Sequence, residues 1–159
     1  MGCGSFVFAL LLIFFVINPI IDNVQLRKRA AKMTYIHFTH NNLGFSFDYP
    51  NDYRLNDRLF YEKHGNYCPE CHLSAFFYED DNEVLAIKIN AREPEGPTTP
   101  VTMNGNVGKR INGVETGDFY WTRYESYIFS HNGLNIEFRF YGKHINVLEQ
   151  HILDTLQFE

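Results

Sequence analysis

The sequence contains few cysteines, and this shortage limits the sites that thiols can form. Of its three cysteines, Cys3 lies in an apolar N-terminal run, and only Cys68 and Cys71 form a Cys-x-x-Cys motif. A zinc ribbon needs a second such motif, which is absent. The shortage therefore excludes a zinc ribbon.

Basic side chains are also scarce in most of the chain. Residues 33–159 contain 10 Lys and Arg against 18 Asp and Glu, a formal net charge of 10 − 18 = −8. Such a domain repels a phosphate backbone, so we expect no nucleic-acid partner.

No set of acid, base and nucleophile side chains occurs at a spacing that indicates catalysis. Asp48, Asp52 and Asp57 are too scattered to be argued into a carboxylate pair. We therefore expect a non-catalytic protein more than an enzyme.

The first 21 residues carry no charged side chain, and Phe6–Val16 is almost unbroken Phe, Val, Leu and Ile. A membrane-spanning helix needs about 20 residues. A signal peptide is disfavoured because no Lys or Arg precedes the run and no small-x-small cleavage site follows it. The sequence predicts a single transmembrane helix over residues 1–22, kinked or ended near Asn18-Pro19.

A basic segment follows this anchor. Residues 23–33 are expected to form a juxtamembrane linker, with Arg27, Lys28, Arg29 and Lys32 on anionic lipid headgroups. We therefore expect residues 1–32 to bind membrane lipid. The positive-inside rule places the remaining domain on the cytoplasmic side.

Residues 34–159 show the alternation that is typical of half-buried strands. Phe45, Phe47 and Tyr49 alternate with polar residues, and Leu134–Tyr141 alternates most cleanly. The Asn-Gly pairs at 104–105, 112–113 and 132–133 predict hairpin turns. Strands are expected over 34–40, 43–50, 73–78, 84–90, 106–111, 114–130 and 134–141, with a short helix over 52–60 and a loop over 92–100.

A helix is predicted after the last strand. Ile145, Leu148, Ile152 and Leu156 form one apolar stripe, with Glu149 off it. The fold class is therefore α+β: an antiparallel meander sheet covered by a C-terminal amphipathic helix and preceded by the membrane helix. Trp121 is interpreted as part of the sheet core rather than of a binding groove.

The strand Gly44-Phe-Ser-Phe-Asp-Tyr-Pro50, the Asn-Gly turns and the closing segment Leu153-Asp-Thr-Leu-Gln-Phe158 resemble PsbP-like proteins of the Mog1/PsbP fold. The resemblance implies a central antiparallel sheet with helices on its faces, and a mostly non-catalytic role in assembly or binding. Relatives in bacteria and archaea are often tethered outside the membrane, in disagreement with the basic flank. Tyr53 stands where the family pattern has Trp, and no catalytic residue carries over.

One cluster has the spacing of metal ligands: His64, Cys68, Cys71 and His72. These residues can form a Cys2His2 zinc site, and Cys68–His72 also matches the c-type haem signature and a redox Cys-Pro-x-Cys centre. The other readings are a local disulfide or two free thiols. No cofactor is expected unless zinc binds here.

Two functions follow from these patterns. The first is a membrane-anchored, non-catalytic binding or assembly module. The alternative is a zinc- or thiol-dependent redox protein that works through Cys68 and Cys71.

Overall fold

The computed structural model describes residues 18–56, 74–89, 97–116, 121–142 and 144–159. The chain divides into two compact units, residues 1–34 and 35–159.

The described part of the first unit is one helix, α2 (Asn18–Ala30). Asn18-Pro19 begins the described part of this helix, which continues to Ala30, and residues 1–17, on which the predicted kink or end depends, lie outside the described residues. The predicted basic linker is helical as far as Ala30, and Arg27, Lys28 and Arg29 occupy the last turn. Cations are favourable at that end of the helix dipole.

Most of the predicted membrane anchor lies outside the described residues. Among the helices that the structure does describe, none has the length and apolar character needed to cross a bilayer.

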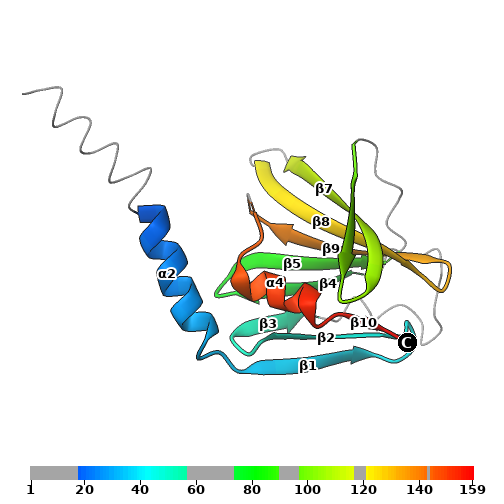
Figure 1. Ribbon diagram of the computed structural model, residues 1–159, viewed down its shortest axis with the longest axis horizontal. Coiled ribbons are helices and arrows are strands. Elements are labelled where there is room, and N and C mark those ends of the chain that lie inside the picture. Colours follow the sequence, from blue (N-terminus) through cyan, green and yellow to red (C-terminus); the bar gives the residue numbers. More distant parts are fainter. Residues whose placement is uncertain (1–17, 57–73, 90–96, 117–120, 143) are drawn as a thin grey trace, which may run out of the picture. The chain divides into compact units, whose positions relative to one another are not determined.

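The described part of the second unit contains two antiparallel sheets and one helix (Figure 1). The larger sheet has seven strands in the order β3-β4-β5-β9-β8-β7-β6, and the smaller has the order β1-β2-β10. The bounds are β1 (Tyr35–His40), β2 (Phe45–Pro50), β3 (Tyr53–Asn56), β4 (Ser74–Glu79), β5 (Asn82–Ile89), β6 (Thr99–Met103), β7 (Asn106–Thr116), β8 (Trp121–His131), β9 (Leu134–Tyr141), α4 (Val147–Asp154) and β10 (Gln157–Phe158). The predicted α+β class, with an antiparallel sheet and a C-terminal helix, is confirmed.

Two of the three Asn-Gly pairs form the expected turns. Asn104-Gly105 joins β6 to β7 with φ of 46° and 80°, and Asn132-Gly133 joins β8 to β9 with φ of 49° and 77°. The third prediction is wrong, because β7 continues through Asn112-Gly113. Gly113 pairs with Tyr124 across the sheet, and a Cβ atom there would overlap the Tyr124 ring.

The predicted helix over 52–60 is also wrong for residues 52–56, the described part of this range. Tyr53–Asn56 is strand β3, which pairs with β4, and Tyr53 is buried. Thr99 and Pro100, expected in a loop, belong to β6. This strand is an edge strand, where a proline without an N–H group is tolerated.

Aromatic rings join the two sheets. The ring centroid of Phe47 on β2 lies 5.6 Å from that of Phe138 on β9 and 5.9 Å from that of Phe77 on β4, both edge to face. Such contacts add about 0.5–1.5 kcal/mol each to the burial of the rings. The core therefore lies between the small sheet and the inner face of the large sheet.

Helix α4 closes this core next to β2. Leu148, Ile152 and Leu153 are buried, as is Leu156 just beyond the helix. The backbone N–H of Asp48 on β2 donates to Thr155 Oγ1 at 3.0 Å, across 107 positions of sequence. The side-chain amides of Asn104 and Asn106 both donate to the carbonyl of Leu156.

Glu149 is buried although it lies off the predicted apolar stripe. Its side chain is 4% exposed, and its Oε2 accepts the backbone N–H of Asn146 at 2.7 Å. Asn146 Oδ1 in turn accepts the N–H groups of Leu148 and Glu149, which completes a capping box. Burial first, and then the charges of Glu79 and Glu125, raise the pKa of Glu149 to about 7.

Glu149→Gln is expected to remove a pH-dependent loss of stability. Because folding raises the pKa of Glu149, the folded state favours the protonated carboxyl group. This contribution to stability is fully present below the ordinary pKa of 4.5 and is lost as the pH rises through about 7. At pH 8 the loss in the free energy of unfolding amounts to about 3 kcal/mol. Because glutamine still completes the capping box, the variant should match wild type near pH 4 and be more stable at pH 8.

Urea denaturation of the full chain at both pH values measures this effect. Asp154→Asn, an exposed carboxylate on the same helix, is the matched control and should show no such divergence. An equal stability difference for Glu149→Gln at both pH values would contradict the prediction.

Candidate functional site

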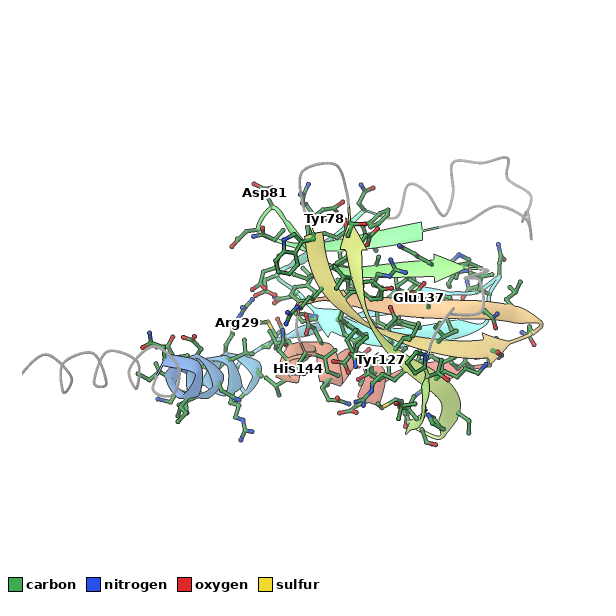
Figure 2. All side chains as sticks on the ribbon, turned by 90° about the horizontal axis from the view of Figure 1, so that it is seen from above. Arg29, Tyr78, Asp81, Tyr127, Glu137 and His144 are labelled. Carbon is green, nitrogen blue, oxygen red and sulfur yellow. The ribbon has the colours of Figure 1, made fainter. Side chains whose placement is uncertain are left out.

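The two faces of the seven-stranded sheet differ in chemistry. Tyr127 and Glu137, both labelled in Figure 2, lie on neighbouring strands, but Tyr127 pairs with Phe138 and therefore shares the inner face. Glu137 faces the opposite side, the outer face, together with Arg139 and Tyr141. The predicted outward direction of these three residues is confirmed, since their neighbours Ile136, Phe138 and Phe140 form the core.

A polar network covers the centre of the outer face. Glu137 Oε1 accepts the hydroxyl of Ser126 at 2.6 Å and the Nε–H of Arg139 at 2.8 Å. Arg139 also donates from Nη1 to Glu115 Oε2 at 3.1 Å. Glu137 is only 4% exposed, so this buried carboxylate is stabilised by charge-assisted hydrogen bonds.

Small residues beside Arg139 leave room for a hollow. In the sheet register Arg139 lies between Ser126 on β8 and Ala86 on β5. Next to them is a cleft of about 480 Å³, which we call the outer cleft; its lining residues are Phe76, Asn82, Glu83, Lys88, Glu115, Thr122 and Tyr141. Its volume is within the range of small-molecule sites.

A β-bulge brings Glu83 into this cleft. Phe77 pairs with Leu85, but the next pair is Tyr78 with Glu83, so Val84 is the extra residue. Val84 packs against the core, and Glu83 is thereby moved to the outer face. Strict alternation from Leu85 would instead have placed Glu83 on the inner face.

The two carboxyl groups of the outer cleft have opposite pKa shifts. Burial raises the pKa of Glu83, and the charge of Glu115 adds to this effect. Burial acts in the same direction on Glu115, but the cations Lys88 and Arg139 outweigh it and lower its pKa. The two carboxyl groups of the cleft therefore differ in acidity, with the pKa of Glu83 above and that of Glu115 below the ordinary value.

The hydroxyl of Tyr141 lies between these groups. It donates to Glu115 Oε2 at 3.1 Å and is within hydrogen-bonding reach of Glu83. Burial, Glu83 and Glu115 together raise the pKa of Tyr141 and keep it protonated. Separated carboxyl pKa values are typical of acid–base pairs, but Glu115 is held by Arg139 and Tyr141, which suits a fixed hydrogen-bond acceptor.

A glycine, Gly113, makes room for the aromatic ring that packs against Arg139. The guanidinium of Arg139 lies 4.2 Å from the ring centroid of Tyr124, and a Cβ atom at Gly113 would overlap the same ring. Because Gly113 has no Cβ atom, the Tyr124 ring has room beside β7 and can pack against Arg139. Gly113 therefore helps to position Arg139, one of the two cations that lower the pKa of Glu115.

The residues singled out from the sequence are placed only in part. His64, Cys68, Cys71 and His72 lie outside the described residues, and within the described ranges no three His, Cys, Asp or Glu side chains are grouped to hold a metal ion. Trp121, interpreted as part of the sheet core, is 67% exposed at the start of β8, where the guanidinium of Arg123 lies 5.9 Å from its ring centroid. No sequence pattern marks the cleft residues Glu83, Lys88 and Glu115 as site residues.

A second polar cluster lies on the inner face. Glu125 Oε1 accepts the hydroxyl of Tyr127 at 2.7 Å and lies 3.7 Å from Arg110, and His144 lies 3.8 Å from the other carboxylate oxygen. Glu125 is buried, and neither this cluster nor Glu149 lines the outer cleft. We therefore regard it as structural.

Gly113→Ala is expected to lower the free energy of unfolding by about 1–3 kcal/mol, because the new methyl group must displace the Tyr124 ring. In a Tyr124→Ala background the same substitution should cost much less. Urea denaturation of the four proteins gives this coupling. Additive effects would show that the close approach of Gly113 and Tyr124 does not contribute to stability.

Comparisons with known proteins give the fold and no family. No protein-family model matches the sequence, and no curated protein matches it significantly. A crystal structure of a protein from Bacteroides thetaiotaomicron VPI-5482 is similar, with a TM-score of 0.52 and 13% sequence identity. The match covers 77% of this chain and 48% of that protein, so the chain spans about half its length. At this identity the similarity concerns the α+β antiparallel fold alone.

Proposed function

We propose that this protein is a membrane-anchored, non-catalytic binding module of PsbP-like type that holds its ligand in the outer cleft. The observation that carries the proposal is the cleft itself, a polar hollow on the seven-stranded sheet with Phe76, Lys88, Glu115 and Tyr141 in its lining. A few fixed polar groups around an apolar surface are typical of ligand sites.

The bonding of Glu115 favours binding over catalysis. Its Oε2 accepts hydrogen bonds from both Arg139 and Tyr141 at 3.1 Å. Removing a proton from a substrate would require this carboxylate to give up stabilisation from a cation and a hydroxyl, which makes it a weak base. The same contacts fix its orientation for recognition.

The PsbP-like assignment rests on the sequence resemblance. The antiparallel sheet and its C-terminal helix agree with the architecture that the resemblance implies. The segment Phe45–Pro50 that carries the motif is the central strand of the small sheet and packs into the core.

Attachment to the membrane is proposed through residues 1–32. Helix α2 supports this proposal, because Ile20, Ile21 and Val24 are exposed near its start and Arg27, Lys28 and Arg29 lie at its end. Exposed apolar residues beside cations suit the boundary between acyl chains and headgroups.

Blocking the outer cleft should abolish ligand binding. In saturation-transfer NMR, the full chain in nanodiscs is mixed with pools of neutral sugars, amino acids and polyamines. Thr122→Trp, which fills the cleft, should lose the signals that wild type gives, whereas Thr102→Trp on edge strand β6 should keep them. Signals retained by Thr122→Trp, or absent from wild type, would refute a binding role for the cleft.

Replacing Arg27, Lys28, Arg29 and Lys32 by Gln should remove the preference of the full chain for anionic over neutral vesicles in flotation assays. Each such cation contributes about 1 kcal/mol near an anionic surface. Lys109→Gln with Arg123→Gln, exposed cations of the second unit, is the control. A preference that survives the fourfold replacement would argue against headgroup binding by this segment.

A further inference from the structure

We propose that the outer cleft recognises a neutral, hydroxyl-rich ligand, a carbohydrate of one or two rings. The inference rests on the proposed binding function and adds the chemical class of the ligand. It follows from the charges of the cleft, its hydrogen-bonding groups and its aromatic rings.

Most of the charge in and around the outer cleft is already paired, because the carboxylates of Glu115 and Glu137 share Arg139, and burial raises the pKa of the third carboxyl group, Glu83. Glu115 is paired with Arg139 at 3.1 Å, and Arg139 is also paired with Glu137 at 2.8 Å. Lys88 faces Glu137 in the sheet register, and its charge acts on both Glu83 and Glu115. A charged ligand would have to compete with these pairs, whereas a neutral ligand leaves them intact.

The hydrogen-bonding groups remain available to a ligand despite these pairs. A carboxylate accepts about four hydrogen bonds, and from the described residues Glu115 accepts two, one from Arg139 and one from Tyr141. Lys88 and Asn82 supply donors to the same lining, and Thr122 can both donate and accept. A sugar hydroxyl also donates and accepts, so adjacent hydroxyls can bond to a carboxylate and an ammonium group together.

Aromatic side chains supply the remaining part of such a site. Phe76 and Tyr141 line the cleft and are both partly exposed. The negative face of an aromatic ring attracts the weakly positive C–H groups of a sugar ring. Rings beside fixed carboxylates therefore match a ligand that is apolar on its faces and polar at its rim.

The test titrates the full chain in nanodiscs with maltose, cellobiose and lactose, and with lysine and spermidine as charged probes. At least one disaccharide should bind, and Glu115→Gln should weaken it about tenfold by removing a charged acceptor. Asp81→Asn removes the same charge at an exposed hairpin tip and should change nothing. Phe76→Leu, which keeps an apolar side chain, should also weaken binding.

Several outcomes would overturn the inference. These are no binding of any disaccharide at about 10 mM, well above a Kd of about 1 mM, or disaccharide binding that neither Glu115→Gln nor Phe76→Leu weakens. Binding of only lysine or spermidine, lost in Thr122→Trp, would overturn the ligand class and leave the binding function standing. Hydrolysis of a bound disaccharide would keep the ligand class and refute the non-catalytic function.

Discussion

Phe47 meets Phe138 and Phe77 edge to face, and these contacts hold the small sheet against the large one. Burial of the inner face is the main source of stability for such a domain, because apolar area leaves water there. Because successive side chains of a strand point to opposite faces of the sheet, the charged residues that alternate with the core residues lie on the outer face. The outer cleft is thus a consequence of how the core is packed.

Space on the outer face depends on residues with little or no side chain. Ala86 and Ser126 flank Arg139 in the sheet register. Gly113 leaves room for the ring of Tyr124, which packs against Arg139. Larger residues at these positions would displace the guanidinium group that donates to Glu115. These small residues therefore help to position Arg139 beside the outer cleft.

The alternation of Leu134–Tyr141 and the Asn-Gly turns at 104–105 and 132–133 were sufficient to predict an antiparallel sheet. The failures have local physical causes. Asn112-Gly113 has turn chemistry but lies under Tyr124, a relation that depends on strand register. The bulge at Val84 moves Glu83 to the outer face without a sequence signal.

Other residues of the site and fold were misread or could not be placed. Glu149 did carry a signal, because Asn146 three residues earlier is the pattern of a capping box. Glu115 and Lys88 are brought into one cleft by strands far apart in the sequence, which no local pattern reveals. The proposed His64–His72 ligand cluster lies outside the described residues, so its zinc, redox and structural interpretations stay predictions.

The hydrogen bond from Asp48 to Thr155 spans 107 positions of the sequence, and β10 pairs with the same strand, β2. During synthesis the aromatic strand β2 therefore emerges from the ribosome long before its β10 partner exists. Contacts of such large sequence separation slow folding. Until residues 147–158 have been made, β2 presents an open strand edge and an incompletely covered aromatic face, which is the period when the nascent chain is most prone to aggregate.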